Sequence, residues 1–135
     1  MARKLPDLVG DRAIIQGESW NHEKHTGIAF PCGDWTLWTP SGQIRTNLKG
    51  LTNTLIAEFD WGDPLWDEQQ NLTVFYPQLS ASVTQEMPVT RYQGEGILSV
   101  RNALIYDMEI ALESVVMKGS FAYVQVIGEV TYVSN

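Results

Sequence analysis

The stretch LIYDMEIAL (residues 104–112) has the clearest regular pattern in the chain. Apolar residues occupy every second position on one side, and the other side mixes one apolar residue with two acidic ones. The first set is Tyr106, Met108 and Ile110, and the second is Ile105, Asp107 and Glu109. A period of two places successive side chains on opposite faces of a strand, so this stretch predicts a β-strand with one solvated face.

Further short apolar and β-branched runs lie on both sides of this stretch, separated by turn residues. The predicted strands cover residues 12–17, 28–30, 37–38, 43–46, 54–61, 71–76, 97–100 and 121–133. Pro40-Ser41-Gly42 predicts a hairpin turn between two of them, and Gly94 and Gly96 predict another turn. Residues 79–87 predict the one short helical turn, with Ser80 or Ser82 as its cap and Pro88 after it.

Strands at intervals near ten residues, without strand–helix–strand alternation, are typical of a sandwich or small barrel. We therefore predict an all-β fold, an Ig-like antiparallel β-sandwich of seven to nine strands with one short helical turn. Residues 1–11, with Pro6 and Gly10, predict a flexible N-terminal arm, and residues 12–135 predict a single β-sandwich domain.

The composition is that of an acidic globular domain. The 135 residues carry a net charge of −7, with nine Lys and Arg against sixteen Asp and Glu. Affinity for nucleic acid rests mainly on basic groups that neutralise phosphates, and the few basic residues here are scattered. The composition therefore argues against a nucleic acid partner and, by the same reasoning, against an anionic membrane surface.

Targeting and redox signals are sparse. The N-terminus MARKLPDLVGDR has no apolar run that would make it a signal peptide, and no stretch approaches the roughly 20 apolar residues of a membrane span. The single cysteine, Cys32, cannot form an intrachain disulfide. These features favour a protein that is made and folded in a cytoplasm.

Groups with potential chemistry each have a more ordinary interpretation. His22 and His25, with Cys32 and Asp34 downstream, have a metal-ligand spacing, but only a helix would bring the two imidazoles together. We expect an exposed polar loop there, and a small buried or half-buried thiol at Cys32. We predict no catalytic, cofactor-binding or metal-binding residue and no enzyme activity.

One pair of carboxylates keeps a catalytic alternative open. Asp107 and Glu109 share a strand face, which weakly resembles the carboxylate pair of a glycosidase. A solvated face is the preferred interpretation of this pair. The alternative, a small hydrolase, requires both carboxylates to lie in a pocket.

The number of tryptophans is the most unusual feature of the composition. The five are Trp20, Trp35, Trp38, Trp61 and Trp66. Aromatic rings anchor protein interfaces and also stack on sugar rings. We expect one or two to lie in the core, and we predict an interface at Trp35, Trp38, Trp61 and Trp66. A carbohydrate-binding module, with Asp63 or Asp67 accepting hydroxyls, is the alternative.

The order of the segments resembles the N-terminal β-sandwich module of phage baseplate upper proteins and related tail-fibre attachment domains. The similar pieces are IIQGESW (14–20), SGQIRTN (41–47), LIAEFDW (55–61), NLTVFYPQLSASVTQEMP (71–88), LIYDMEIAL (104–112) and VIGEVTYVSN (126–135). The resemblance covers most of residues 12–135. Residues 21–39 are longer than that pattern, and residues 89–103 add a turn and a strand.

The resemblance implies a docking part without catalytic residues or cofactors. Such a module attaches tail-fibre or receptor-binding components to a phage tail or baseplate through protein–protein contacts. Since this chain stops where that module closes, the expectation is a free-standing structural adaptor. It would be present in several copies in the virion after synthesis in the host cytoplasm, with other tail or baseplate proteins as its partners.

Overall fold

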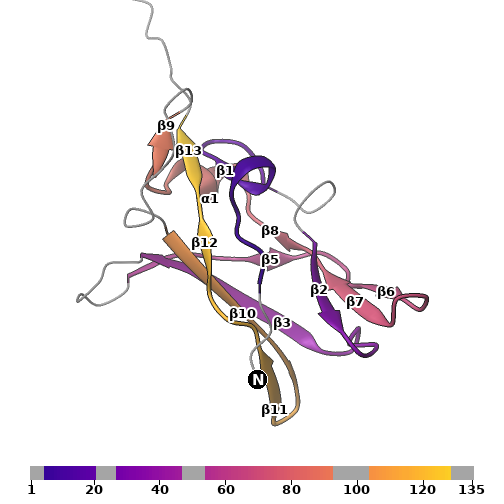
Figure 1. Ribbon diagram of the computed structural model, residues 1–135. Helices are drawn as coiled ribbons and strands as arrows, with labels where there is room; N and C mark the ends of the chain where they lie inside the picture. The colour runs from indigo at the N-terminus through magenta and orange to yellow at the C-terminus, as the bar shows by residue number, and fades with distance from the viewer. Residues whose placement is uncertain (1–4, 21–26, 47–53, 93–103, 129–135) are drawn as a thin grey trace, which may run out of the picture.

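A computed structural model describes residues 5–20, 27–46, 54–92 and 104–128 of the chain (Figure 1). Strands dominate, with one 3-10 turn and one short helix. In chain order the elements are η1 (Gly10–Arg12), β1 (Ile14–Ile15), β2 (Ile28–Pro31), β3 (Thr39–Thr46), β4 (Leu55–Glu58), β5 (Asp60–Trp61), β6 (Leu65–Asp67), β7 (Leu72–Phe75), β8 (Pro77–Gln78), α1 (Ala81–Gln85), β9 (Arg91–Tyr92), β10 (Leu104–Leu112), β11 (Val115–Lys118), β12 (Ala122–Val124) and β13 (Val126–Gly128).

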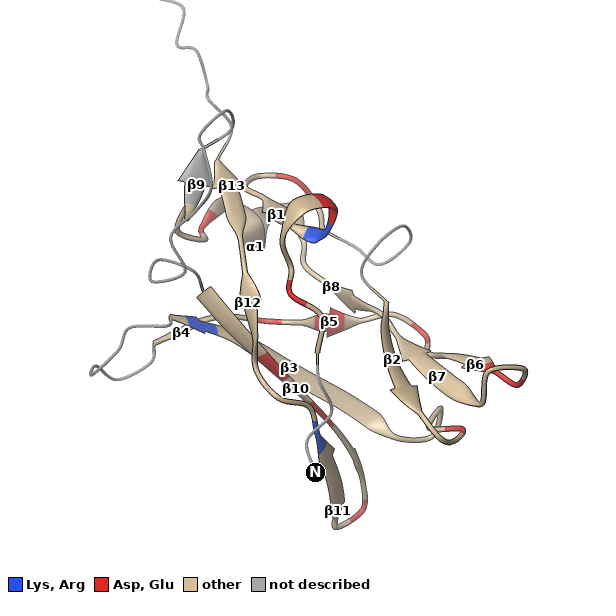
Figure 2. Ribbon diagram, viewed as in Figure 1, with Lys and Arg blue, Asp and Glu red and all other residues tan. Residues whose placement is uncertain are grey.

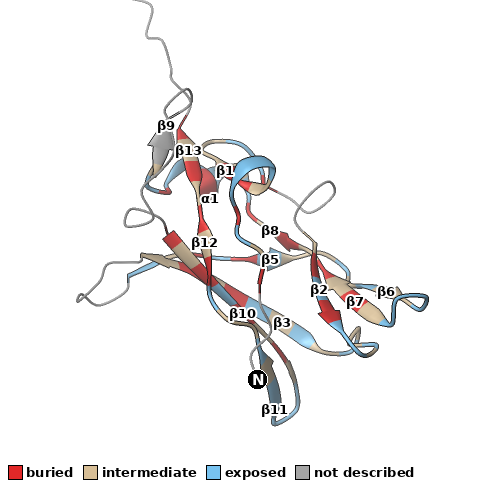
Figure 3. Cartoon of the chain, viewed as in Figure 1, coloured by how far each residue is buried: buried red, intermediate tan, exposed pale blue. Residues whose placement is uncertain are grey.

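Strand β10 is the centre of the largest sheet, whose order is β11-β10-β3-β4. On one side it pairs with β3 along almost its whole length, from Leu104 opposite Thr46 to Ala111 opposite Thr39. On its other side β12 pairs with its first half and β11 with its second half. The predicted alternation is confirmed, because Tyr106, Met108 and Ile110 are buried in the core (Figure 3).

Smaller sheets complete the fold. Strands β2, β7 and β6 form an antiparallel sheet, β5 pairs with β8, and β1, β13 and β9 form a sheet whose pairings are parallel. The all-β, sandwich-like prediction is confirmed. The parallel sheet was not predicted, since its strands are two or three residues long and have no readable period. The chain also breaks into more strands than the seven to nine expected.

The hairpin predicted at Pro40-Ser41-Gly42 is wrong, because these residues lie inside the continuous strand β3. Ile110 of β10 faces Pro40, and Met108 faces Gly42. Strand β4 pairs with β3 only between Gln43 and Arg45, so the edge of β3 beside Pro40 belongs to no ladder. Proline lacks a backbone donor and is tolerated at such an unpaired edge.

Gly42 is required by close packing. A Cβ atom there would lie 2.6 Å from the carbonyl oxygen of Asp107 and 3.1 Å from the ring of Phe59. The backbone N–H of Phe59 also donates to the carbonyl of Gly42 at 3.1 Å. The absent side chain therefore lets an aromatic residue approach the sheet directly, where a glycine would otherwise leave the strand thinly packed.

We predict that Gly42→Ala lowers the free energy of unfolding by about 1–3 kcal/mol, because the added methyl group meets rigid backbone as well as a buried ring. Urea denaturation measures this change. Ser41→Ala, at an exposed neighbouring position in the same strand, is the control and should change the value by less than about 0.5 kcal/mol. Equal stability of the two variants would contradict the packing argument.

The segment predicted as a flexible arm is packed against the sheet over residues 5–9, which corrects that prediction. Leu5 and Leu8 are buried. The N–H of Leu8 donates to the carbonyl of Tyr123 at 2.8 Å, and the N–H of Gln125 donates to the carbonyl of Leu8 at 2.9 Å. Two buried leucines and a strand edge are sufficient to order a short segment. Residues 1–4 lie outside the described residues.

Tyr106 connects this segment to the core. Its hydroxyl donates to the carbonyl of Pro6 at 2.6 Å, and its ring packs edge-on against Phe59 with centroids 5.7 Å apart. Burial raises the pKa of the Tyr106 hydroxyl, which keeps it protonated as a donor. One side chain thus links the N-terminal segment, β10 and the aromatic core.

Tyr106→Phe should lower the free energy of unfolding by about 1–3 kcal/mol, because the carbonyl of Pro6 loses its partner in a partly buried site. Urea denaturation followed by tryptophan fluorescence measures the loss. Tyr123→Phe, at a half-buried tyrosine on β12, is the matched control and should behave like the unmodified chain. A Tyr106→Phe protein as stable as this control would show that the hydroxyl does not hold the segment.

The remaining sequence predictions have mixed outcomes. The helix is confirmed as α1, where the Ser80 side chain accepts a hydrogen bond from the N–H of Val83. The described part of the strand predicted over residues 121–133 divides at Gln125, whose N–H donates to the carbonyl of Leu8 and whose carbonyl accepts from the N–H of Ile14. Residues 129–133 lie outside the described residues. The strand predicted at 97–100 and the turn at Gly94 and Gly96 lie outside the described residues.

Candidate functional site

Trp35 and Trp38 form one cluster in the loop between β2 and β3. Their rings meet edge to face with centroids 5.2 Å apart, and both pack against the core. The N–H of Trp35 donates to the buried Thr73 hydroxyl at 2.7 Å, and its indole N–H donates to the carbonyl of Pro31 at 3.1 Å. These rings are half-buried anchors of the loop.

The other tryptophans are also partly or fully enclosed. Trp66 is half-buried and faces Thr73 across the β6–β7 ladder, so it lies on the same side of that sheet as Thr73. Trp61 is half-buried elsewhere, with its ring 5.8 Å from that of Phe59. Trp20 is a core residue, in keeping with the expectation that one or two would be. Thr73 therefore links Trp35, which donates to its hydroxyl, with Trp66, which lies opposite it in the ladder, and the Trp38 ring contacts that of Trp35.

The loop that carries Trp35 and Trp38 presents an exposed leucine. Leu37 is 83% exposed, the highest value among the exposed large hydrophobic residues. The Asp34 carboxylate accepts from the N–H and the hydroxyl of Thr36, at 3.0 and 2.7 Å, and the N–H of Trp38 donates to the carbonyl of Trp35 at 2.9 Å. We call residues 32–38 the Leu37 loop. The hydrogen-bonded turn between the rings of Trp35 and Trp38 exposes the Leu37 side chain to solvent.

Asp34 makes the Leu37 loop sensitive to acid. The hydroxyl of Thr36, followed by its backbone N–H, holds the pKa of the Asp34 carboxyl below the ordinary value of 3.8. Because the folded pKa is below the unfolded one, the ionised carboxylate stabilises the loop above the unfolded value. This contribution is lost as the pH falls through the folded pKa.

We predict that Thr36→Val raises the pKa of Asp34 toward 3.8, since the larger of its two hydrogen bonds is removed while the backbone one remains. A pH titration of the Asp34 carboxyl carbon by NMR measures the shift. Thr39→Val, at an exposed threonine on β3, is the control and should leave that titration unchanged. An unchanged Asp34 pKa in the Thr36→Val protein would contradict the assignment.

A second exposed apolar surface lies along β11, the edge strand of the largest sheet. Val115 is 56% exposed and Val116 is 47% exposed, and Leu112 and Phe121 nearby are also exposed. We call residues 115–118 the β11 edge, since β10 is their one strand neighbour within the described residues. Sequence reasoning assigned no strand here, although Val-Val-Met after Glu113-Ser114 has the composition of a strand that follows a turn.

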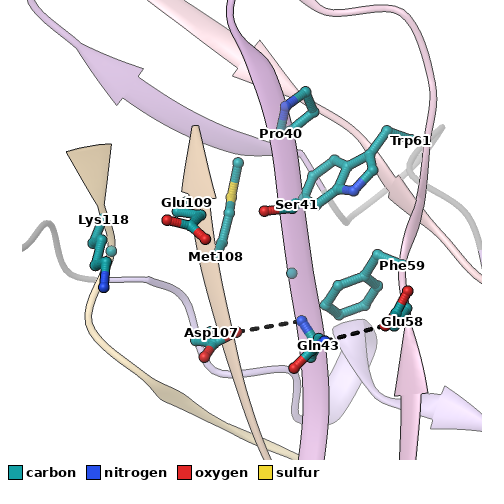
Figure 4. Close-up of a pocket in the computed structure, with 12 residues that line it drawn as sticks. Pro40, Ser41, Gln43, Glu58, Phe59, Trp61, Asp107, Met108, Glu109 and Lys118 are labelled. Carbon is teal, nitrogen blue, oxygen red and sulfur yellow. Dashed lines mark hydrogen bonds between the residues drawn. The ribbon is translucent and has the colours of Figure 1, made fainter. Parts of the chain in front are cut away.

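A groove of about 490 Å³ lies over strands β3 and β10 of the largest sheet (Figure 4). Lys118 lies at one end, Trp61 and Glu58 lie at the other, and β10 and β3 pass between them. The N–H of Gln43 donates to Asp107 at 3.3 Å, and its side-chain amide donates to Glu58 at 3.1 Å. The Arg45 guanidinium donates to the Gln43 side-chain oxygen. Hydrogen bonds within the chain therefore already engage part of the polar lining of the groove.

Asp107 and Glu109 both line this groove. Asp107 is exposed and bonds to the backbone of Gln43, and Glu109 faces Lys118 across the β10–β11 ladder. A glycosidase acid is ordinarily a carboxyl in an apolar pocket, and neither group has that surrounding. The two carboxylates share one strand face at an open groove, with Asp107 exposed and Glu109 half-buried.

The predicted metal and thiol positions have different outcomes. His22 and His25 lie outside the described residues, and no group of three or more His, Cys, Asp or Glu suited to a metal ion occurs within the described ranges. Cys32 is exposed, which corrects the expectation of a buried or half-buried thiol. Its φ of 67° puts the backbone in the left-handed region of a turn at the surface.

The charged residues are spread along the described chain (Figure 2). Lys and Arg appear at separate places, on η1, on the β3–β4 region and on β11, and acidic residues lie between them. Over the part of the chain that is drawn in tan, red and blue, no basic patch forms. No helix among the described residues is long and apolar enough to cross a membrane.

Comparisons with known proteins add no relative to this picture. A scan against protein-family models finds no match, and a search of curated proteins finds none either.

Proposed function

We propose that this chain is a non-catalytic structural module of a phage tail or baseplate that docks other virion proteins. Two lines of reasoning support this. The order of strand segments resembles the docking module of baseplate upper proteins, and the described structure presents apolar surfaces of the kind used in protein contacts. The proposed location is the virion, with several copies of the chain in the assembly.

The single observation that carries the proposal is the exposure of the Leu37 side chain. The Leu37 side chain is 83% exposed, so it contributes little to the packing of the free protein. Its burial by a partner would contribute about 1.5–3 kcal/mol to the free energy of binding. The flanking anchors hold the loop in place, so little entropy is lost on binding.

The chemistry of the exposed groups favours proteins over carbohydrates as partners. Sugar rings stack on the flat faces of exposed aromatic side chains. Here the four tryptophans predicted at the surface are half-buried, while the large exposed side chains are mainly aliphatic, such as Leu37, Val115 and Val116. The predicted interface therefore moves from the tryptophan rings to the leucine that two of them support.

We predict that Leu37→Ser weakens binding to tail or baseplate proteins encoded beside this chain by roughly 10- to 100-fold, since the burial of one leucine is lost. Co-expression with each neighbouring tail protein, followed by affinity measurement, tests this. The free energy of unfolding should stay unchanged, because the side chain is already exposed.

Leu55→Ser is the matched control, at an exposed leucine on β4 and outside the Leu37 loop. It should bind as the unmodified chain does. The proposal is overturned if the unmodified chain binds none of the neighbouring tail proteins, or if Leu37→Ser binds them with undiminished affinity.

A further inference from the structure

The turn between β6 and β7 lies directly beside the Leu37 loop. The N–H of Gly33 donates to the carbonyl of Asn71 at 3.2 Å, which joins the two segments. In the ladders, Pro31 at the end of β2 faces Leu72 of β7, and Leu72 faces Asp67 at the end of β6. Neighbouring strands are about 4.8 Å apart, so the two connections leave the same end of this sheet about 10 Å from each other.

Both connections carry acidic side chains. Asp34 in the Leu37 loop and Glu68 in the β6–β7 turn are exposed, and Asp67 at the start of that turn is half-buried. The Asp67 carboxylate accepts from the backbone N–H and the side-chain amide of Gln70, at 3.1 and 2.8 Å, so the turn fixes its position. We call Asp34, Asp67 and Glu68 the acidic rim of the Leu37 loop.

The segments that build this end of the molecule have no basic residues to offset the acidic rim. Residues 27–46 and 54–92 are described without a gap, and residues 27–44 and 54–90 contain no Lys, Arg or His. Figure 2 shows the Lys and Arg of the described chain on η1, on the β3–β4 region and on β11, and none on β2, β6 or β7. The acidic residues within 54–90 are Glu58, Asp60, Asp63, Asp67, Glu68 and Glu86.

An exposed leucine beside unbalanced carboxylates determines the chemistry of the surface that fits it. Protein interfaces have an apolar centre and a polar rim, and Leu37 supplies the apolar centre here. Like charges brought together at an interface oppose binding, whereas opposite charges accelerate it. A second copy docked through the same loop would bring the acidic rims of both copies together. Charge complementarity therefore favours a basic partner of different sequence.

We propose that the Leu37 loop docks on a protein surface in which Lys and Arg side chains surround an apolar pocket for Leu37. The inference rests on the proposed docking function and adds the chemistry of the partner. Burial of Leu37 slows the dissociation of the complex. The acidic rim accelerates its formation, because charges at the rim of an interface act mainly on the association rate and its dependence on salt.

The first test uses the purified, isotope-labelled full chain and two synthetic peptides with the same apolar centre. In NMR titrations at low salt, Lys-Lys-Leu-Val-Leu-Lys-Lys should shift the amide signals of residues 32–38 and 67–71, and Glu-Glu-Leu-Val-Leu-Glu-Glu should not. Leu37→Ser and Glu68→Lys should each weaken the response to the lysine peptide. The proposal is overturned if the lysine peptide leaves these amides unchanged, or if the two peptides shift them equally.

The matched control is Glu86→Lys, which makes the same change of charge at the exposed C-cap of α1. The Thr84 hydroxyl in α1 bonds to the backbone of Gly17 and Glu18, so this helix packs near β1 and not beside the Leu37 loop. Glu86→Lys should respond to the lysine peptide as the unmodified chain does. A loss as large as that in Glu68→Lys would show that net charge, and not the acidic rim, attracts the peptide.

The second test measures binding kinetics with each neighbouring tail protein that binds the unmodified chain. Glu68→Lys should slow association by roughly 3- to 10-fold at low salt and leave the dissociation rate nearly unchanged. The difference should vanish at about 1 M salt, where the Debye length is about 3 Å. Leu37→Ser should instead accelerate dissociation, since most effects of interface substitutions lie in the dissociation rate.

The two tests separate failure of the basic partner from failure of the docking function. Tail-protein binding that requires Leu37, with an association rate that Glu68→Lys leaves unchanged at every salt concentration, would overturn the basic partner and leave the docking function intact. A lysine-peptide response at the Leu37 loop, in a chain that binds no neighbouring tail protein, would support the basic partner chemistry and contradict the tail or baseplate role.

Discussion

The buried side chain of Tyr106 is the contact on which the rest of the structure depends. Its ring packs against Phe59, which in turn touches Trp20 and Trp61, while its hydroxyl holds the carbonyl of Pro6. Strand β10 thereby joins the aromatic core to the N-terminal segment, and that segment closes the edge of β12. The same segment places Leu5 against Gly119, at the junction between β11 and β12.

Sequence reasoning succeeded where a regular period extends over several residues and failed where local signals and tertiary context disagree. The alternation of β10 and the Ser80 cap of α1 were readable because strand pleating and helix capping are local. The turn at Pro40-Ser41-Gly42 was misread because a ring from β4–β5 fills the space above Gly42, which no local signal shows. The buried Leu8 was assigned to a flexible arm because its partners are more than 100 residues away.

The Leu37 loop was predictable by region and not by residue. The tryptophans at positions 35 and 38 predicted an interface in this region, which is where the Leu37 loop lies. Only the structure shows that Trp35 and Trp38 pack inward and leave the leucine between them exposed. Strand β11 was missed, although Val-Val-Met after Glu113-Ser114 has the composition of a strand that follows a turn. Bulky rings serve here as supports, and smaller aliphatic side chains face the solvent.

If the proposed function holds, a cryo-electron microscopy map of virions from the source of this chain resolves it in the tail or baseplate. The account predicts several copies of the chain in the tail or baseplate, with Leu37 of each copy covered by another virion protein. A particle that lacks the chain, or one in which every copy leaves the Leu37 loop facing solvent, would contradict the account.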